Sequence, residues 1–309
     1  MYHAEPAARR TVFPPYGSQI AGHSIASFIA YLAPWEFSPT VALVCALTAV
    51  LYVRGLAVLR QRGVRAGFWR PFSFLLGLAL IYGSLQTYLD FLSQHMFWVH
   101  RLQHLLLHHI APFLMVVAAP GPILRQGIPA AWRGAERALW QRSAVRAVLK
   151  PLQNPWIAGF LFVGLVFFWL IPSIHFTAML DANRYRLMNW SMAVDGVFFW
   201  WLMLTPRSAQ GAAAVAYGPR VTVLVVTGFL QLFLGAFMVM DKRILYGVYG
   251  ICGRAWAISP LVDQQVGGCL TWIPPAMMSL LGLLVVIHHA LNDSEPSTAL
   301  AGPAAVAAR

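Results

Sequence analysis

The chain has 309 residues, of which 59% are hydrophobic and only 10% are charged, whereas an ordinary soluble domain has roughly 25% charged residues. This composition nearly excludes a soluble enzyme. The formal net charge of +12 is weak support for nucleic-acid binding, because the basic residues lie mostly in short segments between apolar runs, where they orient a membrane protein. We therefore predict a membrane protein that contacts the lipid bilayer and no nucleic acid.

Residues 1–38 form an N-terminal segment that we predict to lie partly at the membrane interface. Its apolar stretch from Ile20 to Leu32 is followed by Pro34 and is shorter than the roughly 18 residues that a spanning helix needs. An interfacial helix is therefore favoured over a span.

Residues 39–291 are predicted to form one all-α domain, a polytopic membrane bundle of about seven transmembrane helices. Each predicted span is a run of mainly apolar residues that can cross a hydrocarbon core about 30 Å thick as one helix. The predicted spans are 39–59, 72–92, 95–118, 156–174, 188–204, 221–240 and 272–291. The alanine-rich tail, residues 292–309, is predicted to be disordered.

The distribution of basic residues predicts the orientation. The loops on one side of the predicted spans hold 14 of the 22 lysines and arginines, and Arg101 lies inside the third span. Short loops rich in Lys and Arg stay in the cytoplasm. We therefore place the N-terminus outside and the C-terminus in the cytoplasm.

The third span carries five of the ten histidines of the chain. At about 100° per residue, His100, His104 and His108 fall on one face of the helix at successive turns. His95 and His109 point to roughly the opposite side. Ionisable side chains inside a membrane are costly and usually functional, so this face is the candidate site.

Histidines spaced i, i+4 on a helix can share one metal ion. Imidazole suits Cu, Zn, Ni and Fe, and a nearby thioether favours Cu(I). Further ligands must come from other spans, where His175, Asp195 and several methionines are available. The alternative is that the histidines only form hydrogen bonds inside the bundle and the methionines fill space.

Two polar features lie close to this face in the predicted topology. Arg101 needs a partner inside the membrane, for which Asp90, Asp195 and Asp263 are candidates. Asp263 and Gln264 fall in the predicted last outer loop, ahead of two glycines, and would cap the histidine face. A glycine turn held by side-chain to backbone bonds is an equally good interpretation.

Two cysteines, Cys252 and Cys269, lie in the same predicted loop. Oxidising conditions outside the cell would permit a disulfide between them. The sequence alone leaves open whether they pair.

Several motifs together resemble the CtaG family of caa3-type cytochrome c oxidase assembly factors, which are seven-helix bacterial membrane proteins. The resemblance covers most of the chain and is strongest at the histidine motif of the third span. Its motifs are Trp35-Glu36-Phe37-Ser38-Pro39, Leu51-Tyr52-Val53-Arg54-Gly55, His100-Arg101-Leu102-Gln103-His104, Ala111-Pro112, Ala119-Pro120, Ile174-His175, Phe199-Trp200-Trp201 and Asp263-Gln264-Gln265-Val266-Gly267-Gly268.

The chain departs from the family at two places. Members commonly have Glu-His where this chain aligns Met188-Asn189, and Met-Met where it has His108-His109. Exchange of methionine for histidine keeps a copper ligand, whereas asparagine in place of histidine removes one. Asp195 is a candidate to compensate for that loss.

The resemblance implies a non-catalytic factor of the bacterial inner membrane that helps to assemble a haem-copper oxidase, with oxidase subunits and other copper chaperones as partners. Together with the histidine face it predicts copper delivery on the outer side. His100 and His104 would be the primary ligands, with His108 and His175 in support and Asp263 and Gln264 shaping the entrance.

Two rival functions remain from the residues alone. One is a redox protein that holds haem between axial histidines such as His104 and His175. The other is a copper or ion transporter, which requires a continuous polar path through the bilayer. The transporter stays a hypothesis because His108 and His109 lie near the predicted midplane.

Overall fold

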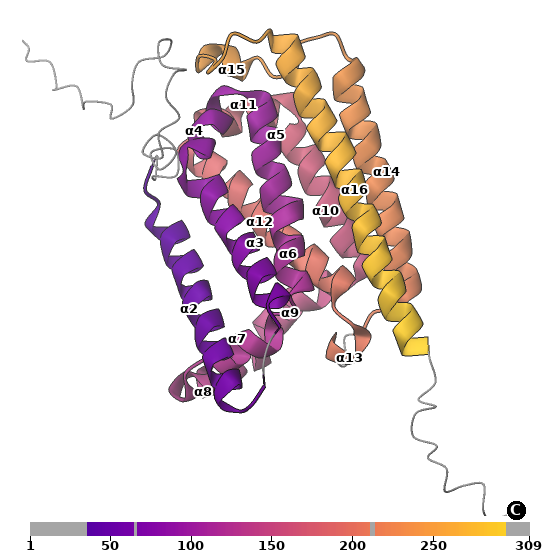
Figure 1. Ribbon diagram of the computed structural model, residues 1–309. Helices are drawn as coiled ribbons and strands as arrows, with labels where there is room; N and C mark the ends of the chain where they lie inside the picture. Colours follow the sequence, from indigo (N-terminus) through magenta and orange to yellow (C-terminus); the bar gives the residue numbers. More distant parts are fainter. Residues whose placement is uncertain (1–35, 65–66, 211–213, 295–309) are drawn as a thin grey trace, which may run out of the picture.

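The computed structural model describes residues 36–64, 67–210 and 214–294. Over these ranges the chain forms an all-α helical bundle, which confirms the predicted fold class (Figure 1). The predicted interfacial stretch, from Ile20 to Leu32, and the part of the predicted tail after Ser294 lie outside the described residues.

Four helices are each long and apolar enough to cross a bilayer on their own. They are α2 (Pro39–Gln61), α12 (Ala182–Leu204), α14 (Tyr217–Met240) and α16 (Pro260–Ser294). Three bent pairs also qualify when each is counted as one span, which gives up to seven spans among the described residues and agrees with the prediction.

The bends lie at short breaks in the helices. The first pair, α3 (Trp69–Gln86) and α4 (Tyr88–His95), is bent by 55°. The second pair, the helical segment Phe97–Val117 and α7 (Gly121–Gly127), and the third pair, α9 (Ser143–Leu152) and α10 (Pro155–Leu170), are each bent by 78°.

Short helices gather at the two ends of the bundle (Figure 1). One end carries α4, α11 (Pro172–Leu180) and α15 (Val248–Ile251), and we call it the α15 end. The other carries α7, α8 (Arg133–Gln141), α9 and α13 (Arg207–Gln210), and we call it the α8 end. The predicted orientation places the α15 end outside the cell.

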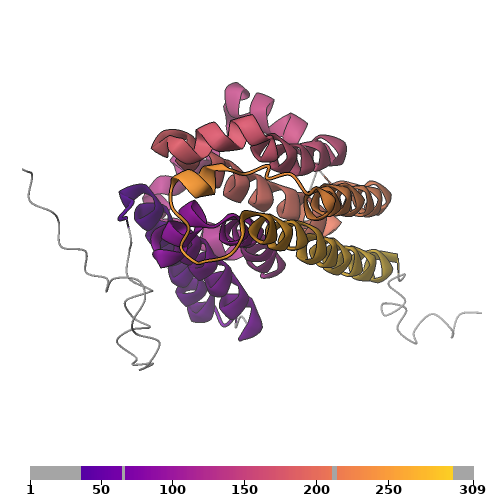
Figure 2. The ribbon, with the colours of Figure 1, turned by 90° about the horizontal axis from the view of Figure 1, so that it is seen from above.

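Helices α14 and α16 lie side by side along most of their length, as the view from above shows (Figure 2). Glycine makes this close approach possible. A Cβ atom on Gly268 would lie 2.7 Å from the Cγ2 of Val239 and 3.0 Å from the carbonyl oxygen of Gly235. Helix α16 also packs against α5 (Phe97–Leu105) and so joins the histidine helix to the last span.

Two breaks have identifiable causes in the sequence. Pro172 lacks the N–H that would continue α10, and it begins α11. Ala119 adopts a left-handed conformation (φ 50°) between Val117 and α7, and the Pro120 that follows turns the chain into the 78° bend.

A π-helical turn, Leu106–Ile110, separates α5 from α6 (Ala111–Val117). Its cause is Pro112, which has no N–H to donate to the carbonyl four residues earlier and would clash with that carbonyl in a regular α-helix. That carbonyl belongs to His108, and it accepts a hydrogen bond from the indole of Trp200 at 3.2 Å instead.

The structure corrects two details predicted from the sequence and answers one question that the sequence left open. The third span is broken at Met96, which is extended (φ −141°, ψ 127°), so that His95 belongs to α4. Helix α16 begins at Pro260 instead of 272, so Gly267 and Gly268 lie inside the helix, where they allow close packing and form no turn. Cys252 and Cys269 are both free.

Candidate functional site

The amino end of the histidine helix is capped by a residue from another span. The carboxylate of Asp263, in the first turn of α16, accepts the backbone N–H of Phe97 at 3.1 Å and of Trp98 at 2.8 Å. The same carboxylate pairs with the guanidinium of Arg254 at 2.5 Å. A negative charge at this position satisfies otherwise unpaired donors and favours the helix dipole, so Asp263 fixes where α5 begins.

Three buried imidazole rings meet below this cap. The ring centroids of His100 and His104 are 4.2 Å apart, and those of His100 and His175 are 5.1 Å apart. His175 comes from α11, which the break at Pro172 directs over α5. All three side chains are at most 1% exposed. The structure therefore brings together three of the four histidines predicted as ligands.

Two of these rings have hydrogen-bond partners on both nitrogens. The Nδ1 of His175 donates to the carbonyl of Trp169 at 3.1 Å, and its Nε2 accepts from the hydroxyl of Tyr249 at 3.0 Å. The Nε2 of His104 donates to Asn189 Oδ1 at 3.1 Å. Both rings are therefore held in defined orientations.

The third ring, His100, has no hydrogen-bond partner for either nitrogen among the described residues, although it is fully buried. Buried polar atoms are nearly always paired, and leaving one unpaired costs about 1–3 kcal/mol. Its position between the other two rings makes His100 the centre of the candidate site.

Arg101 lies beside the three rings. Its Nε donates to the hydroxyl of Thr271 at 2.8 Å, and its Nη1 lies 3.3 Å from the Nδ1 of His104. The aspartates predicted as its partners are engaged elsewhere, and no described carboxylate forms an ion pair with it. A guanidinium with a hydroxyl and an imidazole as partners keeps a positive charge next to the candidate site.

His108 lies deeper in the bundle, in the π-helical turn. Its Nε2 bonds to Asp195 at 2.9 Å and its ring stacks on Phe162 at 4.0 Å. His109 bonds to Gln231 of α14 at 3.3 Å and is also buried. Asp195 thus meets His108 and not His104, so it does not take the place of the histidine that the family has at Asn189.

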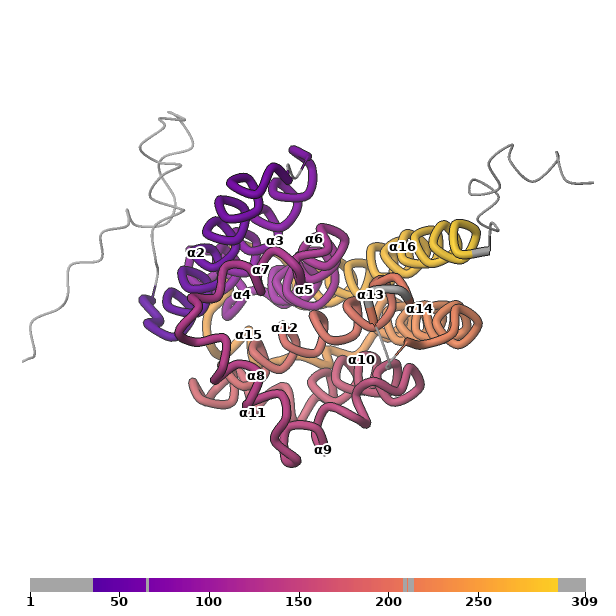
Figure 3. The backbone as a smooth tube through the Cα atoms, turned by 90° about the horizontal axis from the view of Figure 1, so that it is seen from below, coloured from indigo at the N-terminus to yellow at the C-terminus, as the bar shows by residue number. Residues whose placement is uncertain are grey.

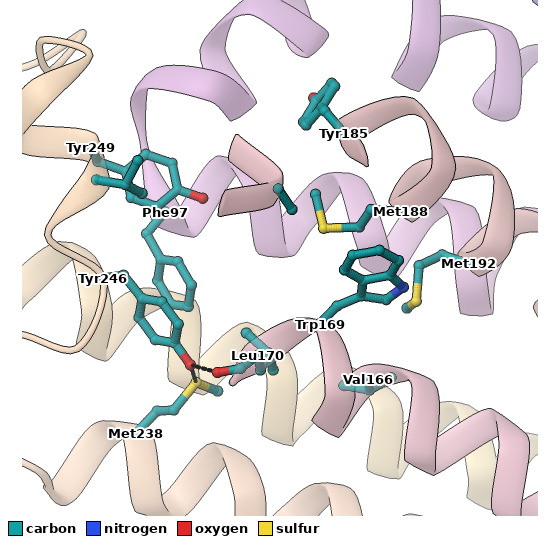
Figure 4. Close-up of a cluster of buried hydrophobic side chains, with 12 residues drawn as sticks. Phe97, Val166, Trp169, Leu170, Tyr185, Met188, Met192, Met238, Tyr246 and Tyr249 are labelled. Carbon is teal, nitrogen blue, oxygen red and sulfur yellow. Dashed lines mark hydrogen bonds between the residues drawn. The ribbon is translucent and has the colours of Figure 1, made fainter. Parts of the chain in front are cut away.

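Below His175 the site rests on an apolar cluster from α10, α12 and the segment after α14. Phe97 stacks on Tyr246, whose hydroxyl donates to the carbonyl of Leu170 at 3.0 Å (Figure 4). Met188 and Met192 of α12 lie beside Trp169 (Figure 4). Two thioethers therefore belong to the same cluster as Phe97, whose ring centroid lies 5.9 Å from that of His175.

A polar network next to the rings was missed by the sequence analysis. Gln103 and Tyr185 both donate to Asp90 Oδ1, at 2.8 Å each, and Gln94 donates to the other carboxylate oxygen at 3.1 Å. A signal was present: Gln103 lies between the two histidines of the motif, and a glutamine inside a span needs a polar partner.

A cavity of about 260 Å³ opens at the α15 end beside this network. Its walls come from the start of α2, from α4 and from α11 and α12, and they include Asp90, Met179, Tyr185 and Asn189. Asn189 is the partner of His104. The cavity therefore approaches the three rings from the side of α12.

Asp263 and Gln264, predicted to shape the entrance, do not line this cavity. Gln264 accepts the N–H of Leu245 at 2.8 Å and donates to the carbonyl of Arg243 at 3.0 Å. It thus holds the segment after α14, as Asp263 holds α5. The structure gives both side chains a positioning role.

The structure places no ready-made metal site at these rings. Within the described part of the chain, no group of three or more histidine, cysteine, aspartate or glutamate side chains has the geometry to hold a metal ion. His104 and His175 would each have to exchange a hydrogen bond for a metal bond.

We expect Gly196→Ala to disturb the π-helical turn. A Cβ atom at this position of α12 would lie 2.5 Å from the carbonyl oxygen of His108, and such overpacking costs about 1–3 kcal/mol. Thermal unfolding in detergent should show a lower Tm. Gly164→Ala is the control, because nothing lies within 4 Å of its Cβ position and alanine favours a helix. If the Tm of Gly196→Ala were as high as that of Gly164→Ala, the close packing of α12 on the π-helical turn would be contradicted.

The family model of the cytochrome c oxidase caa3 assembly factors matches residues 50–293. Uncharacterized proteins of Mycobacterium bovis and Mycobacterium tuberculosis are each 25% identical to the chain over 250 residues, which are 78% of this chain and 37% of the relative. The chain thus spans little more than a third of the length of these curated relatives. No solved structure matches it. The family match covers the histidine motif, the π-helical turn and α16, and the chain belongs to the caa3-type cytochrome c oxidase assembly factor (CtaG) family.

Proposed function

We propose that this assembly factor carries copper for a haem-copper oxidase at the outer side of the membrane. The observation that carries the proposal is His100, a fully buried imidazole with neither nitrogen paired, in contact with two further histidines. Imidazole and thioether are ligands that copper prefers, and Met188 packs in the adjoining cluster.

The hydrogen bonds of the neighbouring rings suit a cargo that is bound and released. Nε2 of His175 accepts a hydrogen bond from the hydroxyl of Tyr249, and Nδ1 of His104 faces the guanidinium of Arg101. In the copper-free protein, the lone pair with which each of these two rings would bind copper is thus held by an exchangeable donor. Loading breaks two hydrogen bonds and unloading restores them, which favours transient binding over a permanent centre. His108, one turn deeper, would support the site from below.

The cavity at the α15 end supplies the access path in this proposal. Asp90 and Met179 line it and Asn189 joins it to His104. A carboxylate attracts a cation and a thioether binds Cu(I). Oxidase subunits and copper chaperones would dock at this end, around the mouth of the cavity.

The test is the copper content of the oxidase in a strain that lacks this protein, complemented with variants. Wild type should restore oxidase copper and activity, whereas the double variant His100→Ala, His104→Ala should fail and should lose copper affinity by about 10-fold or more. His95→Ala is the matched control, because the hydrogen bond that His95 forms among the described residues is to the carbonyl of Phe91 in its own helix. Full oxidase copper in the deletion strain would overturn the proposal.

The same purified protein separates this proposal from haem binding. His100 contacts both His104 and His175, so a porphyrin would have to displace it to reach axial ligands on those two rings. We expect no Soret band in the absorption spectrum. A haem spectrum that vanishes in the His104→Ala variant would favour the redox protein instead, and copper uptake into vesicles would favour the transporter.

A further inference from the structure

A second cavity, of about 860 Å³, lies at the α8 end of the bundle and shares no lining residue with the candidate site. Four arginines from three segments line it, and Glu136 is the one carboxylate among its described lining residues. The arginines are Arg70, Arg125, Arg133 and Arg137. The cavity therefore has a strongly positive lining.

These arginines are not neutralised within the described residues. No described carboxylate forms an ion pair with any of them. Arg133 donates to the carbonyls of Ile128 and Gln126, and Arg137 to the carbonyl of Arg133. Several guanidinium N–H groups are thus left to bind an anion, and phosphate is one of the anions that arginine recognises with paired hydrogen bonds.

Much of the remaining cavity wall is apolar. It includes Val116 and Val117 at the end of α6, Trp201 and Leu204 of α12, and Val285 of α16. A free inorganic ion gains nothing from such a wall. The combination of guanidiniums and a hydrocarbon-like wall fits an amphiphile that has a phosphate headgroup.

An adjacent cavity, of about 660 Å³, shares Trp201 with the first. It is lined by Arg146 and Lys150 of α9 and by Val197 and Phe198 of α12, together with Trp140 of α8. Two neighbouring cavities with basic and apolar walls thus lie on the two sides of one tryptophan.

The helices beside both cavities have the character of interfacial helices. Helices α8 and α9 cross the end of the bundle, as the view from below shows (Figure 3), and neither has a buried residue. They expose Leu139, Trp140 and Val148 next to their basic residues. A tryptophan-bearing, basic helix pair of this kind lies in the headgroup region of a bilayer.

We propose that the 860 Å³ cavity binds an anionic phospholipid of the cytoplasmic leaflet. The phosphate lies among the four guanidiniums, and the acyl chains run along Val116 and Trp201. Basic pockets between spans on the cytoplasmic side are suited to such headgroups. The site is separate from the histidines, so it stands whether or not copper is bound.

The test is lipid binding to the purified, delipidated full chain, measured by native mass spectrometry with phosphatidylglycerol and with phosphatidylcholine. Wild type should bind phosphatidylglycerol in preference. The variant Arg70→Gln, Arg125→Gln, Arg137→Gln should bind it about 10- to 100-fold more weakly. Arg133 is left in place because it holds two backbone carbonyls.

The matched control removes three charges from the same predicted side, Arg54→Gln, Arg60→Gln, Arg142→Gln. These arginines are exposed and do not line the cavity, so phosphatidylglycerol binding should stay within about 2-fold of wild type. Equal loss in both variants, equal binding of the two lipids, or displacement of phosphatidylglycerol by millimolar inorganic phosphate would each overturn the proposal. Thermal unfolding of both variants checks that they fold.

Discussion

Replacing His100 with leucine is expected to have two effects: it stabilises the copper-free protein, and it abolishes copper binding. In the copper-free state neither nitrogen of His100 has a partner among the described residues, so the imidazole is a buried polar group without compensation. An apolar side chain of similar size removes that penalty, which is about 1 kcal/mol or more. The expected result is a higher Tm in detergent without copper.

Copper is expected to reverse the order of the Tm values of wild type and His100→Leu. A ligand that binds the folded state raises its stability by about 2.7 kcal/mol at 100 times its Kd, so Cu(I) should raise the Tm of wild type and leave that of His100→Leu unchanged. Residues kept for function at the expense of stability show this pattern. An equal copper-induced shift in both proteins would show that His100 binds no copper.

His175→Leu is the matched control for the stability half of the prediction. His175 is as buried as His100, but both of its nitrogens are bonded, to the carbonyl of Trp169 and to the hydroxyl of Tyr249. Leucine there leaves two buried partners unsatisfied, which costs about 1–3 kcal/mol for each. We expect a lower Tm for His175→Leu, opposite in sign to His100→Leu. The same sign for both would mean that hydrogen bonding does not distinguish the two rings.

The arrangement of His100 and His104 on one face could be predicted because it is local. Two residues four apart on a helix share a face whatever surrounds them, and the apolar runs that define the spans are equally local. The seven spans follow from the same kind of information. What the sequence could not supply is which distant groups meet these faces.

Two long-range contacts account for much of what the sequence could not predict. The break at Met96 depends on Asp263. Its carboxylate accepts a hydrogen bond from the N–H of Phe97, which is 166 positions away. Tyr249 reaches His175 from the segment that follows α14. Neither pairing can be recognised from a periodic pattern of residues, because partners from different spans have no fixed separation in the sequence.

The deeper histidines show how one local feature changes a periodic pattern. The prediction treated the third span as a regular helix and put His108 on the face of His100. Pro112 instead imposes a π-helical turn, in which His108 pairs with Asp195 and its carbonyl with Trp200. The proline was visible in the sequence, but whether it kinks, breaks or widens a helix depends on the groups that take up the freed carbonyl.

Replacing Asp263 with alanine is expected to be among the most destabilising single changes at the α15 end. The side chain is fully buried, accepts two backbone N–H groups at the start of α5 and pairs with Arg254. Its removal leaves a partly buried guanidinium and two donors without partners, and breaking a buried pair costs about 3–5 kcal/mol. Asp181→Ala is the control, an exposed cap of α12 that bonds one N–H and should cost about 1 kcal/mol.

Further variants distinguish the two contributions of Asp263 to stability, the cap of α5 and the ion pair with Arg254. Asp263→Asn keeps an acceptor for α5 but loses the charge opposite Arg254, so its Tm should fall between those of wild type and Asp263→Ala. In the double variant Asp263→Ala, Arg254→Ala the guanidinium no longer lacks a partner, and the double should cost less than the sum of the singles. Additive losses would mean that the ion pair contributes nothing.

The copper affinity of these variants decides whether Asp263 acts on the site through α5. His100 lies one turn after the capped N–H groups, so a frayed first turn displaces its ring from His175. We expect Asp263→Ala to lose copper affinity by about 10-fold or more at a temperature where it remains folded, and Asp263→Asn to keep most of it, because the amide oxygen still accepts an N–H of the first turn. If Asp263→Asn lost as much affinity as Asp263→Ala, the charge itself and not the placement of α5 would govern the site.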